Sequence, residues 1–289
     1  MVALDVLLNG VVLGGLYALV AIGLNFQYGI ARIMNLSYGE GLMLAAFSTF
    51  WLYTIYQFSP LLSVLVVIPV AFVASWLIFL IFMQPMVKRA LSRDMLERDS
   101  ILVTFGLLFV VQGGALWGWG SQPRGYLYLS ESVGFSDVTF VLNRLLALAL
   151  ACLMGVGAWL FLRYTRIGTA MRAVSVDPVA AQLVAIDVRR YSGLAFAIGG
   201  AMVAASGALI SMFWSVSPYT GIEFTLKALI VVILGGVGHM MGALVAGVVL
   251  GVAENVTAYL LDPGLTLAVN FGLFLIILLV RPTGIFGRR

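Results

Sequence analysis

The segment Arg163–Arg190 reads RYTRIGTAMRAVSVDPVAAQLVAIDVRR. It carries five arginines and two aspartates, whereas the other long stretches of the chain are almost all apolar. A helix start stands at its centre. Asp177 is a good N-cap, because its carboxylate can accept free backbone N–H groups of the first turn, and Pro178 fits the first helical position. We therefore predict a short helix that begins at this Asp-Pro pair.

The predicted helix has one face of small and apolar side chains. These are Val179, Ala180, Ala181, Leu183, Ala185 and Ile186. Val179, Leu183 and Ile186 follow the i, i+4, i+7 spacing of one helix face. The helix is too short and too polar at its ends to cross a bilayer. It is therefore expected to be a docking element for a soluble partner, held by arginines between two membrane spans.

The composition excludes a soluble globular domain. Of the 289 residues, 62% are hydrophobic and 10% are charged, so we predict one polytopic, all-α membrane domain over residues 1–289, with a cytoplasmic loop at 163–190. The net charge of +4 is expected to report membrane orientation and not nucleic-acid binding. The single cysteine excludes an intrachain disulfide.

Nine apolar runs predict about eight to ten transmembrane helices. The runs lie at about 6–24, 41–58, 61–82, 101–118, 143–162, 191–214, 224–234, 242–261 and 265–280. We predict nine passes, the seventh incomplete, because the run at 224–234 would cover only ~17 Å as a helix. With the N-terminus outside and the C-terminus inside, most of the 16 basic residues lie on the inner side, as the positive-inside rule requires.

Two predicted spans carry glycines at the spacing that lets helices approach closely. Gly10 and Gly14 lie in the first span, and Gly247 and Gly251 lie in the eighth. We expect these residues to pack helices together within one subunit, in preference to forming a dimer seam.

Two segments are expected to interrupt the helices at membrane depth. The first is Asn25–Glu40, NFQYGIARIMNLSYGE, and the second is Leu234–Gly242, LGGVGHMMG. Non-helical backbone within a bilayer persists only where protein or a watery cavity satisfies its polar groups, and such breaks mark solute pathways in transporters. The predicted break in the second segment rests on four glycines, Gly235, Gly236, Gly238 and Gly242.

The chain lacks the motifs of nucleotide binding and of common hydrolases. Neither lysine, Lys88 or Lys227, follows a glycine, so a phosphate-binding Gly-Lys-Ser/Thr loop is excluded. A lone histidine, His239, excludes a paired-histidine metal site, and no GxSxG elbow occurs. We predict a protein that is not an enzyme, with no metal and no cofactor of its own.

Polar residues inside the spans are the candidates for a solute path. A carboxylate in hydrocarbon is costly, so Glu40 and Glu254 should face a cavity or a partner. Three roles stay open for Glu254: solute contact, pairing with an arginine, or a protonated helix contact. Glu223 and Lys227, at i and i+4, are interpreted as a surface pair. The predicted path residues are Asn25, Asn35, Ser37, Tyr38, Glu40, Glu254 and Asn255.

Four stretches give the chain a family resemblance. They are Gly15–Ile30 with Asn35–Glu40, then Arg166–Ile186, Lys227–Gly251 and Leu279–Gly287. With these stretches the chain resembles the LivH-type inner-membrane permease subunits of bacterial ABC importers for branched-chain amino acids, and their relatives for urea and short amides. The block AMRAV-xx-DP-xAA is the most specific of these signals.

The resemblance implies an ABC-importer permease fold with interrupted helices in the inner (cytoplasmic) membrane. It implies that Arg172 and Asp177–Ile186 form a coupling helix for a cytoplasmic ATPase. The implied partners are a second homologous permease subunit, two ATPase subunits that bind the ATP, a periplasmic solute-binding protein and membrane lipid. The competing hypothesis is a stand-alone channel or ion-coupled transporter that uses Glu40 and Glu254.

The sequence departs from the family at three places. Tyr38 stands where the family often has histidine, and His239–Met241 replace a common Ser-Ile-Pro. Both departures lie in the interrupted segments, so they bear on solute identity. Val179 replaces a common glutamate in the coupling helix, which bears on the choice of ATPase.

Overall fold

The computed structural model describes residues 2–89, 93–135 and 138–287, and the described chain is almost entirely helical. The helices are α1 (Val2–Ala31), α2 (Tyr38–Tyr56), α3 (Pro60–Ile78), the π-helical turn η1 (Phe79–Met83), α4 (Gln84–Arg89), α5 (Arg93–Trp119), α6 (Leu142–Tyr164), α7 (Arg166–Val176), α8 (Pro178–Leu183), α9 (Val188–Ile210), α10 (Thr220–Gly235), α11 (Met240–Leu260), the 3-10 turn η2 (Pro263–Leu265) and α12 (Thr266–Val280). A small antiparallel hairpin of β1 (Ser132–Phe135) and β2 (Val138–Val141) is an addition to the predicted all-helical pattern.

Each of the nine predicted apolar runs lies largely within a helix. Seven helical stretches are long and apolar enough to cross a membrane, and they belong to α1, α3, α5, α6, α9, α11 and α12. Helices α2 and α10 are outside that set. Helix α10 has 16 residues, so it spans about 24 Å, less than a hydrocarbon core of about 30 Å. The nine-pass count and the orientation stay predictions.

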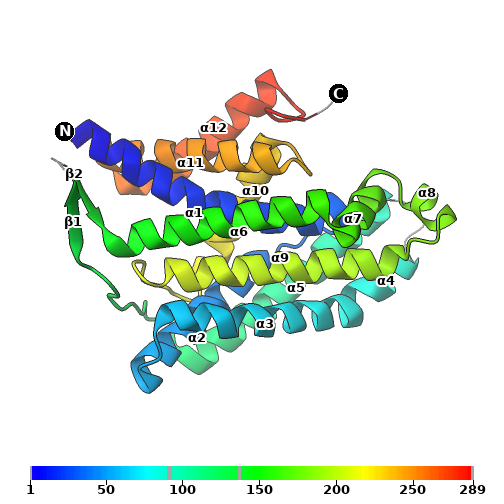
Figure 1. The fold of residues 1–289 in the computed structure, drawn as a ribbon, viewed down its shortest axis with the longest axis horizontal. Helices are drawn as coiled ribbons and strands as arrows, with labels where there is room; N and C mark the ends of the chain where they lie inside the picture. The colour runs from blue at the N-terminus through cyan, green and yellow to red at the C-terminus, as the bar shows by residue number, and fades with distance from the viewer. Residues whose placement is uncertain (1, 90–92, 136–137, 288–289) are drawn as a thin grey trace.

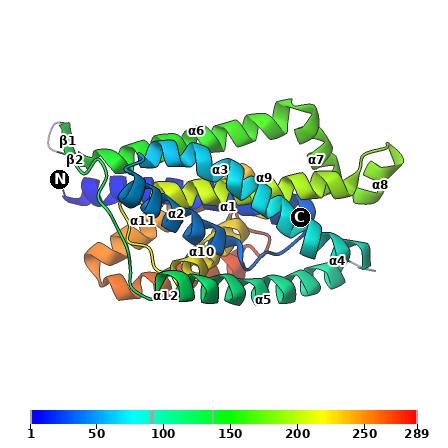
Figure 2. The same ribbon diagram turned by 90° about the horizontal axis from the view of Figure 1, so that it is seen from below.

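The long helices run side by side, with distinct segments at the two ends of the bundle (Figures 1 and 2). The N-terminus and the β1–β2 hairpin lie at one end, and α4, α7 and α8 lie at the other. The arginine-rich segment 163–190, which contains α7 and α8, therefore projects from the end opposite the N-terminus.

Helix α1 packs on α11 along a glycine seam. A Cβ on Gly251 would lie 2.3 Å from the backbone N of Gly14, and a Cβ on Gly14 would lie 2.5 Å from Cα of Val248. Gly10 meets Val252 in the same way, at 2.7 Å. The predicted close approach within one chain is confirmed, because no side chain larger than hydrogen fits at these crossings.

The first interruption is shorter than the sequence predicted. Helix α1 continues to Ala31, so Asn25 lies in a regular helix and the prediction of a break at that residue is wrong. The non-helical segment is 32–37, and it starts with Arg32 in the left-handed region at φ 55°. The end of α1 cannot be located from an amphipathic pattern, because α1 is buried around most of its circumference.

The second interruption is confirmed, with one correction. Helix α10 ends at Gly235, and Gly236 and Gly238 have φ values of 96° and 82°, which favour glycine. Gly242 lies inside α11 and is not part of the break. It is a packing residue, since a Cβ there would lie 2.0 Å from the carbonyl O of Gly235.

Candidate functional site

A cavity with a partly polar lining lies among α2, α3, α5 and α9. It has a volume of about 370 Å³, and we call it the mid-bundle cavity. Its polar lining comes from the end of α1, the 32–37 segment and the start of α2, while aliphatic side chains of α2, α3, α5 and α9 form most of the remaining wall. The polar lining residues near the interruption are Gln27, Asn35, Ser37, Tyr38 and Glu40.

Hydrogen bonds hold the polar lining residues of the mid-bundle cavity in place. The Ser37 hydroxyl donates to Asn35 Oδ1 at 2.7 Å, and Asn35 Nδ2 donates to Gln27 Oε1 at 2.9 Å. Gln27 Nε2 then donates to the carbonyl O of Phe196 at 2.9 Å. The chain of bonds thus ties the non-helical segment to α1 and α9. Gln27 was not among the predicted path residues, although it lies in the quoted segment.

Tyr38 lines the same cavity and also fixes the start of α2. Its buried hydroxyl donates to the carbonyl O of Val20 at 2.8 Å. A Cβ on Gly23 would lie 2.2 Å from that hydroxyl oxygen, so the glycine leaves room for it. Tyr38 therefore offers mainly its ring to the cavity.

Glu40 is a buried carboxylate that lines the cavity without a hydrogen-bond partner among the described residues. The residue is 1% exposed, and both carboxylate oxygens are covered. The carboxylate lies against the first turn of α10, where a Cβ on Gly221 would be 2.6 Å from Oε1. Burial of an unpaired carboxylate is costly, so Glu40 is not expected to stabilise the fold.

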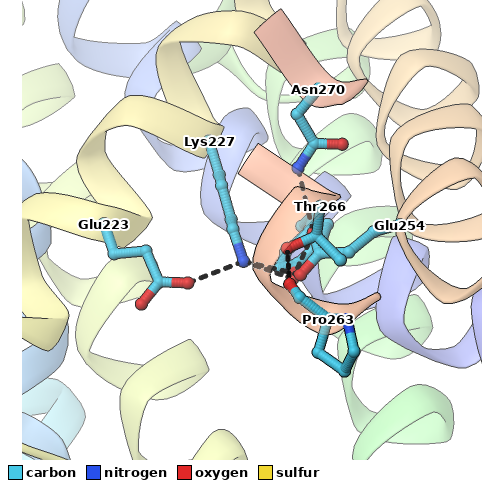
Figure 3. Close-up of polar contacts among 7 residues, drawn as sticks. Glu223, Lys227, Glu254, Pro263, Thr266 and Asn270 are labelled. Carbon is cyan, nitrogen blue, oxygen red and sulfur yellow. Dashed lines mark hydrogen bonds and ion pairs between the residues drawn. The ribbon is translucent and has the colours of Figure 1, made fainter. Parts of the chain in front are cut away.

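A second polar group, which we call the lysine network, lies between α1, α10, α11 and α12 (Figure 3). Lys227 Nζ is 2.8 Å from Glu254 Oε1 and 2.9 Å from Glu223 Oε1. It also donates to the Tyr17 hydroxyl oxygen at 2.9 Å, which accounts for the three ammonium protons. Tyr17 and Asn270 donate to Glu254 Oε2 at 3.0 and 3.1 Å.

The lysine network corrects two sequence interpretations. Glu223 and Lys227 are not a simple surface pair, because Lys227 is 3% exposed. Glu254 pairs with a lysine and not with an arginine. Opposite charges inside two apolar runs were the available signal, since buried charges in membranes pair with one another. Asn255 follows Glu254 in α11 and donates to the carbonyl O of Val6. Neither Asn255 nor Glu254 lines the mid-bundle cavity.

The start of α8 forms as predicted. Asp177 Oδ1 accepts the backbone N–H groups of Val179 and Ala180 at 2.9 and 3.1 Å, and Pro178 holds the first helical position. Val179 and Leu183 are 70% and 85% exposed, so α8 presents apolar side chains outward. Ala181 is buried against the rest of the chain.

The shared apolar face ends earlier than predicted. Helix α8 stops at Leu183, and Ala185 adopts a left-handed conformation at φ 61°. Ile186 therefore lies beyond the helix, and its predicted place on the same helix face is wrong. Asp187 begins α9 directly afterwards by accepting the N–H groups of Arg189 and Arg190.

A second cavity, which we call the inner cavity, lies beside α7 and the glycine break. It has a volume of about 470 Å³. Asn25 lines it, and Asn25 Oδ1 accepts the backbone N–H of Gly238 at 3.0 Å. Arg172 also lines it from α7, the helix that precedes α8. The predicted path residue Asn25 is thus separate from the mid-bundle cavity.

These features define a multi-pass helical membrane protein with interrupted helices, buried polar sites and an arginine-rich helical loop at one end. The family model for the branched-chain amino acid transport system permease component matches residues 6–278. The chain belongs to this family, and the resemblance inferred from the sequence is confirmed.

Curated relatives match nearly the whole chain. It is 30% identical over 302 residues to the high-affinity branched-chain amino acid transport system permease protein LivH of Salmonella typhimurium, covering 99% of this chain and 96% of the relative. It is 30% identical over 296 residues to the corresponding protein BraD of Pseudomonas aeruginosa, with the same coverage. The ribose import permease protein RbsC of Haemophilus influenzae is 25% identical over 245 residues, 82% of this chain and 72% of that protein.

Proposed function

We propose that this chain is the transmembrane permease subunit of a binding-protein-dependent ABC importer in the inner membrane. It translocates a branched-chain amino acid or a similar small solute, and partner subunits bind and hydrolyse the ATP. The observation that carries this proposal is the family match over residues 6–278, together with relatives that are named as branched-chain amino acid permeases and are matched over 96% of their length.

The proposed partners are a second homologous permease, two cytoplasmic ATPases and a periplasmic solute-binding protein. Helix α8 is the proposed contact with an ATPase. Its support is an apolar face with Val179 and Leu183 exposed, on a helix whose first turn Asp177 caps. Such a projecting, preformed element suits a groove on a soluble partner. Arg172 contributes from the neighbouring α7.

The proposed solute path runs through the mid-bundle cavity. Asn35, Ser37, Tyr38 and Glu40 line it together with Gln27, and its volume of about 370 Å³ suffices for one small solute. Its mixture of aliphatic wall and few polar groups suits a solute with an aliphatic side chain. Glu254 acts on this path through α10, because the lysine network fixes the helix whose first turn contacts Glu40.

Reconstitution tests the proposal directly. The chain, its homologous permease and the ATPases are placed in proteoliposomes, and uptake of radiolabelled leucine is measured with the binding protein present. ATP-dependent uptake is expected, with none when the ATPases are omitted. ATP-independent flux through the purified chain alone would replace the importer by the channel or ion-coupled transporter. The same assay with urea and short amides distinguishes the solute classes.

A further inference from the structure

The inner cavity has the chemistry of an anion site. Its basic lining residues are Arg163, Arg172 and His239, and no carboxylate lines it. Neither Arg163 nor Arg172 forms a salt bridge with a carboxylate of the described residues. Arg163 stacks over Trp159 at 5.0 Å, which holds its guanidinium at the wall while leaving its N–H groups available.

A buried amide donor in the wall of this cavity also lacks an acceptor. Asn25 is 4% exposed and uses its Oδ1 to accept the Gly238 N–H. Its Nδ2 group has no partner among the described residues. Buried side-chain donors are normally paired, so the unpaired amide indicates that a bound acceptor completes the site.

The N-terminus of α11 opens onto the same cavity. His239 is the N-cap residue and makes no side-chain capping bond, and Met240 and Met241 line the cavity from the first turn. The first intrahelical bond is that of Ala243 N–H to the carbonyl of His239, so the preceding amides are without intrahelical acceptors. The positive end of a 21-residue helix thus adds to the charge of the two arginines.

We propose that the inner cavity binds a phosphate group, supplied by an anionic lipid headgroup or by a free phosphate. The donors come from three side chains and a helix N-terminus, the combination by which proteins hold phosphate oxygens. Apolar side chains of Leu162, Met240 and Met241 border the donors, so a diacyl lipid could place its headgroup inside and its chains along the bundle.

A phosphate bound there would connect α7 to α11. Arg172 comes from α7, which leads into α8, whereas Met240 and Met241 begin α11 directly after the glycine break. The anion would therefore tie the proposed ATPase contact to the interrupted helix. This site is independent of the transported solute, and its loss would leave the mid-bundle cavity unchanged.

Native mass spectrometry of the purified chain in detergent tests the site. The probes are phosphatidylglycerol, phosphatidylcholine and inorganic phosphate, added to delipidated protein. Phosphatidylglycerol is expected to bind at least tenfold more tightly than phosphatidylcholine, and phosphate is expected to compete. Competition at high affinity by phosphate, with no preference for the lipid, assigns the site to a soluble phosphate. The proposal would be overturned if neither phosphatidylglycerol nor inorganic phosphate bound.

Matched substitutions separate a site from general surface charge. Arg163→Gln and Arg172→Gln are each expected to weaken phosphatidylglycerol binding about tenfold, as loss of one charge-assisted contact does. Arg166→Gln removes the same charge from the start of α7 but does not line the inner cavity, so it is expected to change affinity less than about twofold. Met241→Glu adds an anion at an exposed lining position and should abolish binding in folded protein. An equal effect of Arg166→Gln and Arg163→Gln would contradict the inference.

Discussion

Lys227 places a positive charge in the interior of the bundle, and its partners determine the free-energy cost of burying that charge. Its ammonium contacts two carboxylates and a tyrosine hydroxyl, so each of its protons is used. Removal of one member of a buried pair leaves the other charge without compensation, which usually costs more than the pair ever contributed. The lysine network is therefore expected to be sensitive to single changes and tolerant of a paired change.

The first prediction concerns this network. Lys227→Met should lower the free energy of unfolding by about 3–5 kcal/mol, because Glu254 remains buried and unpaired. Lys227→Met combined with Glu254→Leu should recover much of that loss, and Glu223→Gln should cost less than about 1 kcal/mol, since Glu223 is partly exposed. Unfolding in mixed micelles measures all three. A double variant as unstable as Lys227→Met would refute the interpretation.

Gly221 makes room for the Glu40 carboxylate. Gly221→Ala places a Cβ 2.6 Å from Glu40 Oε1, so the carboxylate must move. We expect solute uptake to fall at least tenfold while the protein still inserts. Gly221→Ala combined with Glu40→Ala should restore the thermal stability but not the uptake, because the methyl group then occupies vacated space. Uptake by Gly221→Ala equal to that of the parent protein would exclude Glu40 from the solute path.

At the level of elements, α8 stands out because its apolar side chains face outward. Leu183→Asp removes an apolar side chain that is 85% exposed, so the melting temperature of the isolated chain should change little. Co-purification of the ATPases should be lost, since a charge enters an apolar contact. Leu127→Asp is the matched control, because Leu127 is also exposed, at 75%, but lies between α5 and β1. Retention of the ATPases by Leu183→Asp would place the contact elsewhere.

The glycine break between α10 and α11 predicts two substitutions of unequal cost. Gly236 and Gly238 both have positive φ, which is unfavourable for alanine by about 1 kcal/mol or more. A Cβ on Gly236 would also lie 2.8 Å from the backbone N of Gly287, whereas a Cβ on Gly238 would meet open space. Gly236→Ala should therefore lower the melting temperature more than Gly238→Ala. Equal shifts would show that the contact with the C-terminal segment does not stabilise the break.

For the whole molecule, the orientation can be tested by labelling. In a Cys152→Ala background, single cysteines replace Leu127 or Leu183, both of which are exposed. With the N-terminus outside, a membrane-impermeant maleimide should label position 127 in intact cells. Position 183 should react only after permeabilisation, because α8 projects from the opposite end. The reversed pattern would invert the predicted topology.

Local sequence signals predicted much of the fold of this molecule. The contacts between segments far apart in sequence could not be predicted from such signals. The apolar runs predicted the helices, and Asp177 marked the start of α8. The spacing of Gly10, Gly14, Gly247 and Gly251 predicted close helix packing within the chain, but not that α1 and α11 are the two partners. The pairing of Lys227 with Glu254 was missed, because the two residues lie 27 positions apart on different helices. The grouping of Gln27 with Glu40, and of Asn25 with Gly238, likewise depends on how segments far apart in sequence pack.

The lysine network also bears on how this protein is made. Lys227 leaves the ribosome 27 residues before Glu254, and Asn270 follows still later. Entry of a lone lysine into the bilayer costs about 2.5–3.5 kcal/mol on insertion scales, and α10 is also short for a span. Helix α10 is therefore poorly suited to enter the bilayer alone, and we expect it to stay at the translocon until α11 emerges. The two helices then partition into lipid together, with Lys227 paired to Glu254.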